Sequence, residues 1–187
     1  PALPHTRTQR SPAPLASDAP RVRITTGVGD IVIALYPRYA PASVENFLSY
    51  VDDGFYDGTI FHRVEPESPG SPVIQGGGFT PNLEPKPTRG PIRGEADNGL
   101  RNLRGAVVMA RTSDPDSATS QFFIDYLDAP RLDHSSNSYG YTVFGVVVEG
   151  MEVVDRITMV PVQPAPGTKL TRVPMIDILL ERVRRER

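Results

Sequence analysis

The sequence contains no cysteine and no tryptophan among its 187 residues. Without cysteine the chain cannot form a disulfide scaffold, a thiolate metal site, an iron–sulfur cluster or a thiol nucleophile. Long apolar runs are also missing, because no segment approaches the roughly 20 apolar residues that a helix needs to cross a bilayer. We therefore expect no insertion into a membrane.

Neither sign of charge is in excess, since 20 Lys and Arg stand against 22 Asp and Glu for a net charge of −2. Nucleic-acid-binding domains usually carry a basic excess, so we expect no nucleic-acid partner. The sequence is 39% hydrophobic and 22% charged, as in ordinary globular proteins. It shows no apolar stripe that would indicate a subunit interface, and a monomer is the expected state.

Proline and glycine are abundant, with 20 and 16 residues, which favours turns and short strands over long helices. Residues 1–20 hold five of the prolines and few large apolar side chains. They are predicted to form a flexible lead-in, because such a segment cannot bury enough surface to offset its ordering entropy. Residues 21–187 are predicted to form a single domain.

Hydrophobic periodicity predicts the elements of that domain. Residues 21–26 and 30–36 alternate in polarity and form a predicted β-hairpin, while residues 41–53 and 151–158 have the apolar spacing of two helices. Further short strands are expected at residues 59–64, 73–75, 105–110, 121–124 and 142–148, with a last strand through Ile176, Ile178 and Leu180. This pattern predicts a mainly β fold, a closed antiparallel barrel of about eight strands capped by two short α-helices, because closure removes exposed strand edges.

Familiar catalytic sets are poorly represented. His62 lies in an apolar strand, where a hydrogen-bonded structural histidine is the favoured interpretation. A hydrolase built on His134 and a serine ranks last, because no nucleophile elbow supports it. Histidine spacing indicates no metal site. The run Gly76-Gly77-Gly78 lacks the Lys-Ser/Thr of a phosphate loop and indicates a bulge or a close backbone approach.

Three strand segments place polar side chains among apolar ones: Phe61-His-Arg-Val64, Val73-Ile-Gln-Gly-Gly-Gly78 and Ser120-Gln-Phe-Phe-Ile124. Arg63 and Gln75 should point to one surface, with Phe123 as an apolar floor nearby. From spacing alone, an arginine paired with a carboxylate at the edge of the core is the favoured interpretation.

These segments, in this order, resemble the cyclophilin family of peptidyl-prolyl cis/trans isomerases over about residues 21–182. The stretches Gly94–Leu100 and Ser117–Phe123 are most similar to the bacterial branch, including its periplasmic members. The resemblance implies an eight-stranded barrel with two helices, in agreement with the periodicity, and an extended peptide bound in a groove outside the barrel.

The resemblance also implies the site residues. Arg63 matches the family's catalytic arginine, with Gln75 and Phe123 beside it in the catalytic set. Positions that match the family's substrate-binding residues are Val73, Ala110, Arg111, Gln121, Leu132 and Tyr141.

The implied activity is rotation about X–Pro bonds in protein substrates, assisting their folding, by a non-covalent mechanism in which Arg63 stabilises the twisted amide. No cofactor or metal is called for. The implied partners are proline-containing peptides and unfolded protein clients. The alternative is a non-catalytic module that binds proline peptides with weakened turnover.

Several positions depart from the family pattern. The segment between Arg63 and Gln75 is longer than usual, Pro72 and Val73 stand where Phe and Met line the pocket, and Arg131 replaces an aromatic residue. Because cyclosporin contacts are largely apolar, we expect weak cyclosporin binding. The bacterial resemblance and the Pro- and Ala-rich lead-in favour a periplasmic or otherwise exported protein, with a cytoplasmic one as the alternative.

Overall fold

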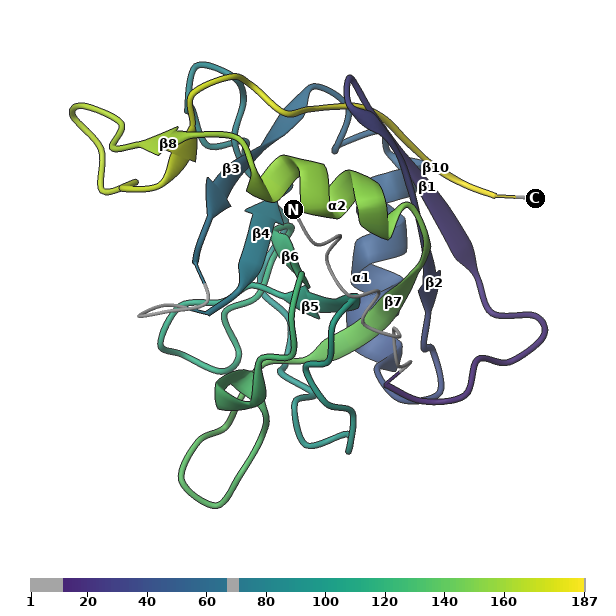
Figure 1. Ribbon diagram of the computed structural model, residues 1–187. Helices are drawn as coiled ribbons and strands as arrows, with labels where there is room; N and C mark the ends of the chain where they lie inside the picture. Colours follow the sequence, from purple (N-terminus) through teal and green to yellow (C-terminus); the bar gives the residue numbers. More distant parts are fainter. Residues whose placement is uncertain (1–11, 67–70, 187) are drawn as a thin grey trace, which may run out of the picture.

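A closed antiparallel β-barrel forms the centre of the molecule in the computed structural model, which describes residues 12–66 and 71–186 (Figure 1). Around the barrel the strands follow the order β1-β10-β3-β4-β6-β5-β7-β2. They are β1 (Arg21–Thr26), β2 (Gly29–Leu35), β3 (Thr59–Val64), β4 (Val73–Gly76), β5 (Ala106–Met109), β6 (Phe122–Asp125), β7 (Val143–Glu149) and β10 (Leu179–Arg185). The predicted eight-stranded barrel is confirmed.

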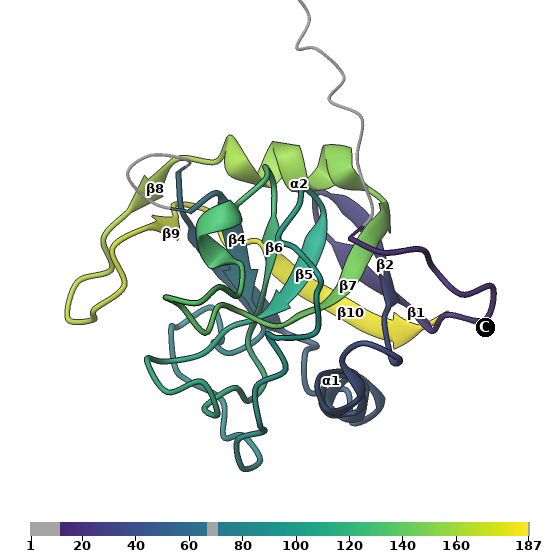
Figure 2. The same cartoon turned by 90° about the horizontal axis from the view of Figure 1, so that it is seen from below.

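Two helices lie on opposite sides of this barrel, α1 (Pro41–Asp52) and α2 (Met151–Thr158), as the turned view shows (Figure 2). Pro41 occupies the first turn of α1, where its missing N–H costs no helical hydrogen bond. The left-handed backbone of Gly150 (φ 88°) precedes α2, and a Cβ at this position would lie 2.2 Å from the carbonyl oxygen of Asp30. Glycine is therefore required where β7 passes into α2.

The barrel interior is filled with aliphatic and aromatic side chains. Phe47 of α1 is fully buried and packs against three rings, with centroids 5.2 Å from Tyr56, 5.5 Å from Phe122 and 5.2 Å from Phe144. A second cluster lies on the outside of the barrel and includes Val73, Val108 and Phe123. Alternate residues of β6 therefore serve two apolar clusters, since Phe122 points inward and Phe123 outward.

The last strand begins later than predicted. Ile176 lies in a bend with 60% of its surface exposed, and β10 runs from Leu179 through the charged residues to Arg185. Charged side chains are tolerated there because the outer face of β10 meets solvent and acidic partners, such as Asp57, whose Oδ1 is 2.8 Å from Nη1 of Arg184. Residues 175 and 176 instead connect the barrel to a small sheet of β8 (Val162–Gln163) and β9 (Val173–Pro174).

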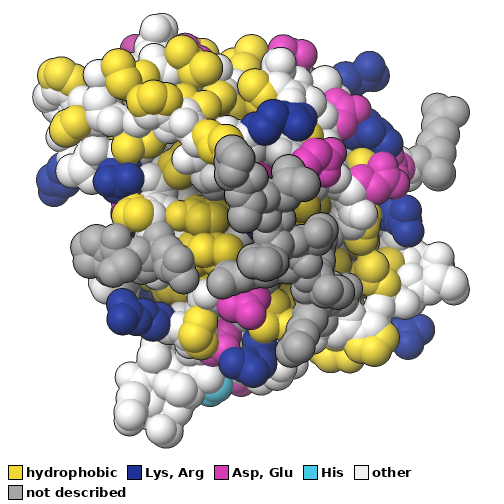
Figure 3. Space-filling view, viewed as in Figure 1, with side chains coloured by type: hydrophobic (Ala, Val, Ile, Leu, Met, Phe, Trp, Pro, Cys, Tyr) yellow, Lys and Arg dark blue, Asp and Glu magenta, His cyan; other side chains and the backbone are white. Residues whose placement is uncertain are grey.

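Apolar side chains are visible along the edge of the molecule where α2 and the β8–β9 sheet lie (Figure 3). Met159, Met175 and Ile176 are the exposed large aliphatic residues in the described ranges. Among the residues described, no helix has the length and apolar character to span a membrane.

The predicted lead-in is described from residue 12 onward, and residues 1–11 lie outside the described part. Ala13 is buried, and its N–H and carbonyl both contact the Tyr36 hydroxyl, at 3.4 Å and 2.9 Å. Pro20 accepts a hydrogen bond from the N–H of Leu35 at 2.9 Å. The segment that precedes β1 thus packs along the end of β2.

Candidate active site

A β-bulge at His62 decides where the side chains of β3 point. Phe61 is opposite Gly76 on β4, yet Arg63 is opposite the adjacent Gln75, so His62 is the extra residue. Regular alternation would place Phe61 and Arg63 on the same side of the sheet. With the bulge, Phe61 packs inside the barrel and Arg63 is the exposed residue of β3.

The glycine run permits this bulge. A Cβ at Gly76 would lie 2.8 Å from the carbonyl oxygen of Ile60, closer than side chains tolerate. Gly77 has a positive φ of 82°, and a Cβ at Gly78 would lie 2.4 Å from Cγ of Gln121. Of the two interpretations of this run, a bulge or a close backbone approach, the close approach is confirmed at Gly76, and the bulge lies opposite it at His62.

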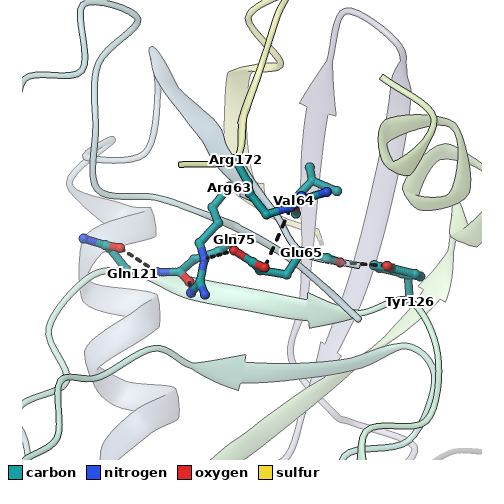
Figure 4. Close-up of polar contacts among 7 residues, drawn as sticks. All are labelled: Arg63, Val64, Glu65, Gln75, Gln121, Tyr126 and Arg172. Atoms are coloured by element: carbon teal, nitrogen blue, oxygen red, sulfur yellow. Dashed lines mark hydrogen bonds and ion pairs between the residues drawn. The ribbon is translucent and has the colours of Figure 1, made fainter. Parts of the chain in front are cut away.

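A chain of hydrogen bonds holds the Arg63 guanidinium (Figure 4). Arg63 Nη1 donates to Gln75 Oε1 at 3.1 Å, and Gln75 Nε2 donates to Gln121 Oε1 at 2.9 Å. On its other edge, Arg63 Nε donates to Glu65 Oε1 at 2.9 Å. The expected arginine–carboxylate pair is therefore present, and Arg63 and Gln75 do share one surface.

Beside this row of hydrogen-bonded side chains lies a hollow of about 300 Å³, whose lining combines charged and polar residues with a group of apolar and aromatic ones. Phe123 and Val73 are almost fully buried, while Leu132 and Tyr141 are half-buried. The rings of Phe123 and Tyr141 meet edge to face with centroids 5.7 Å apart. A pyrrolidine-sized apolar group would be in contact with aromatic and aliphatic surface here, with the Arg63 guanidinium at the rim.

Arg111 serves as part of the wall. Its guanidinium lies 4.3 Å from the centroid of the Tyr141 ring, and its Nε and Nη2 donate to the carbonyl of Gly140 at 3.0 and 2.6 Å. Nη1 donates to the carbonyl of Thr112 at 2.8 Å. With these donors engaged, Arg111 is oriented by the protein and holds Tyr141 in place.

The structure brings eight of the nine predicted site residues to this hollow: Arg63, Val73, Gln75, Ala110, Arg111, Phe123, Leu132 and Tyr141. Gln121 lies one step behind, bonded to Gln75 and lining a neighbouring hollow. The lining also includes Glu65, Ser71 and Arg131, which were not predicted as site residues. Of these, only Arg131 had a signal in the sequence, as a replacement of an aromatic position.

Two buried titratable groups lie close to the hollow. His62 is 2% exposed, as predicted, and its Nδ1 has no hydrogen-bond partner among the described residues, while a backbone hydrogen bond with Ile60 involves the imidazole. Burial, reinforced by the neighbouring Arg63 charge, lowers the His62 pKa to about 4. Asp125, two residues after Phe123, is fully buried with both carboxyl oxygens unpartnered in the same part of the chain. Burial, together with Asp133 and Asp128, raises the Asp125 pKa well above its usual range.

We expect His62 to make the protein sensitive to acid. Its pKa is near 6.5 when unfolded and about 4 when folded, so the unfolded chain binds the extra proton first. Neutral His62 therefore contributes about 3 kcal/mol to the free energy of unfolding. This contribution is fully present above pH 6.5 and is lost as the pH falls through about 4. Urea unfolding from pH 7 to 4 should show this loss, and it should be smaller in His62→Gln. An equal loss in both proteins would contradict the assignment.

His134 does not form a hydrolase triad in the described ranges. Its Nδ1 lies 2.7 Å from the carbonyl oxygen of Tyr139, and no hydrogen bond joins it to a serine or a carboxylate there. Within residues 12–66 and 71–186, no group of three or more His, Asp or Glu side chains is placed to hold a metal ion.

Known proteins match this chain over the residues that form the barrel and the candidate site. Residues 21–183 match the family described as cyclophilin type peptidyl-prolyl cis-trans isomerase/CLD. The sequence is 54% identical over 150 residues to peptidyl-prolyl cis-trans isomerase A of Dickeya dadantii, covering 80% of this chain and 77% of the relative. It is 47% identical over 167 residues to peptidyl-prolyl cis-trans isomerase B of Escherichia coli, covering 87% and 97%.

Among solved structures, a cyclophilin-type isomerase of Cryptosporidium parvum crystallised in the presence of the dipeptide Ala-Pro is similar to this chain. The TM-score is 0.73 at 28% identity, with 89% of this chain and 99% of the other covered.

Proposed function

The chain belongs to the cyclophilin-type peptidyl-prolyl cis-trans isomerases and is an isomerase of that type, and we propose that its substrates are proteins. We further propose that it accelerates rotation about their X–Pro bonds through Arg63. The observation that carries this proposal is that a guanidinium fixed by two hydrogen bonds lines the same hollow as the apolar side chains of Val73, Phe123 and Leu132. Assistance to the folding of client proteins is part of the same proposal.

The physical task is to lower a rotational barrier of roughly 18–20 kcal/mol that amide resonance imposes. When the bond twists, resonance is lost and the prolyl nitrogen gains a lone pair. A donor aimed at that nitrogen stabilises the twisted state more than the planar one, and only such differential stabilisation accelerates rotation. Arg63 suits this role because guanidinium stays charged and presents a rigid fork of donors.

The hollow supplies the second requirement, which is to hold the ring while the rest of the chain turns. Phe123, Leu132 and Val73 give it apolar contact, and Ala110 lies at the wall where substrate backbone would pass. The reaction forms and breaks no covalent bond, so it needs neither a nucleophile nor an acid–base pair.

A second candidate function, a proline-binding module with weakened turnover, is favoured by one observation. Val73 stands where the family pattern has a larger side chain, so a prolyl ring in the hollow would contact less apolar surface. Both functions use the same residues, and they differ only in rate.

An assay of cis-to-trans exchange on X–Pro peptides separates the two functions. We expect rate constants well above the uncatalysed exchange, which takes tens to hundreds of seconds. Exchange measured by NMR line broadening would avoid a coupled protease. A bound peptide whose exchange remains at the thermal rate would establish the binding module and reject the isomerase mechanism. Refolding of a protein limited by proline isomerisation would test client assistance in the same way.

Partners and location extend the proposal. We propose that a monomer acts on proline-containing segments of unfolded clients, and that it is exported, in keeping with the Pro- and Ala-rich composition of residues 1–20. Weak cyclosporin binding is proposed because the exposed Arg131 stands on the wall of the hollow. Titration calorimetry showing tight cyclosporin binding, or cell fractionation finding the protein only in the cytoplasm, would contradict these points.

A further inference from the structure

Glu65 stands directly after β3 and contacts the arginine assigned to catalysis. Its side chain is only 14% exposed, and its Oε1 accepts a hydrogen bond from Arg63 Nε at 2.9 Å. The close-up shows the carboxylate between Arg63 and Arg172 (Figure 4). A hydrogen bond between ionised partners at this distance is short, directional and stronger than one between neutral groups.

The backbone of Glu65 is held on both sides. Its N–H donates to the carbonyl of Val73 at 2.9 Å, and its own carbonyl accepts from the Tyr126 hydroxyl at 2.7 Å. The preceding residue, Val64, exchanges hydrogen bonds with Arg172: its N–H donates to the Arg172 carbonyl at 3.1 Å, and Arg172 Nε donates to its carbonyl at 3.0 Å. The end of β3 is thus tied to β4, to the segment after β6 and to the segment before β9.

Arg172 also compensates the charge of the carboxylate. Its Nε lies 3.8 Å from Glu65 Oε2, on the side away from Arg63. A lone carboxylate beside Arg63 would weaken the positive potential that the guanidinium presents to the hollow. With a second cation sharing the carboxylate, the three groups carry a net charge of one positive unit.

The contacts leave one part of the Arg63 guanidinium available. Nε is engaged by Glu65 and Nη1 by Gln75, whereas Nη2 has no hydrogen-bond partner in the described part of the chain. Two acceptors on different edges fix the plane of the group, and a donor that remains unpaired can serve the substrate.

We propose that Glu65 is a positioning residue for Arg63, supported by Arg172, and that it holds the guanidinium so that Nη2 is presented to the twisting amide. The inference rests on the proposed catalytic role of Arg63. Preorganised donors act without reorganisation at the moment of reaction, so loss of the Nε contact should affect the rotation step more than peptide binding. A merely structural ion pair would change stability and leave the rate constant unaffected.

The test compares Glu65→Ala with Glu65→Gln, whose amide oxygen can still accept the Nε–H. In Glu65→Ala we expect kcat to fall about tenfold while KM changes less than about twofold, because a misplaced catalytic group costs rate rather than affinity. Glu65→Gln should recover most of this loss. Glu45→Ala, which removes an exposed carboxylate on α1, is the matched control and should behave as the wild type. Thermal unfolding shows which variants are folded, and Glu65→Asp, which ends one methylene short, replaces Glu65→Ala if that variant is not.

A double-mutant cycle identifies the route of the effect. In an Arg63→Ala background, Glu65→Ala should cause no further loss of kcat, since the two residues act as one unit. If Arg63→Ala loses most of its activity while Glu65→Ala retains the wild-type kcat, the positioning role is rejected and the role of Arg63 stands. A further loss in the Arg63→Ala background would also reject it. An active Arg63→Ala variant would instead overturn the proposed function itself.

Discussion

Replacement of Arg63 by Ala is expected to lower kcat/KM for X–Pro peptides by about 10²–10³-fold, the usual cost of removing a preorganised donor to a transition state. Arg63 is the exposed residue on β3, and it is fixed by Gln75 and Glu65. Its removal should therefore take away the donor to the prolyl nitrogen without opening the core. Residual acceleration would come from the apolar hollow, which remains.

Arg63→Lys is the informative companion variant. Lysine keeps the positive charge but lacks the planar fork that contacts Gln75 and Glu65 together, so most of the activity should still be lost. Arg185→Ala is a matched control. It removes an exposed arginine of β10 that pairs with Asp52 of α1, and neither residue lines the hollow. Exchange rates for the three variants, with circular dichroism to confirm folding, would decide the matter. Wild-type turnover in Arg63→Ala would refute the mechanism.

Replacement of Phe47 by Ala is expected to reduce the free energy of unfolding by about 3–5 kcal/mol, the range for a large aromatic residue removed from a core. The ring is fully buried, and it joins α1 to Tyr56, Phe122 and Phe144. Both the lost apolar contact and the cavity left among these rings contribute.

For a chain of this length the melting temperature should drop by roughly 10 °C, which calorimetry would measure. Tyr39→Ala is the control, because Tyr39 is 41% exposed and its loss should have a small effect. A similar change in the two variants would mean that the packing of α1 does not determine the stability of the barrel.

The elements of the barrel could be predicted because each has a strong periodic signal. The alternation over β1 and β2 and the helical spacing in α1 agree with the structure to within one or two residues. The exception is β10, which was predicted several residues too early because its charged residues show no apolar alternation. Their side chains face solvent and acidic partners, a condition that depends on segments distant in the sequence.

The residues of the candidate site and the shared surface of Arg63 and Gln75 were predictable, whereas the backbone irregularity that produces this surface was not. Short motifs identified Arg63, Gln75 and Phe123, but simple alternation would have directed Arg63 into the barrel with Phe61. The bulge at His62 reverses that direction, and it depends on Gly76 lying against β3. Glu65 and Arg172 are 107 positions apart, so no local pattern could reveal that they meet beside Arg63.

The pairing of β1 with β10 has a consequence for synthesis of the protein. The first strand of the barrel has one neighbour nearby in sequence, β2, and the other among the last residues described. Once β1 to β7 have emerged from the ribosome, they can form a sheet whose two margins, β1 and β3, are unpaired edge strands. Their backbone N–H and C=O groups lack the hydrogen bonds that β10 will supply. The barrel can close only after β10 emerges, so until then these margins of the nascent chain are available to other chains.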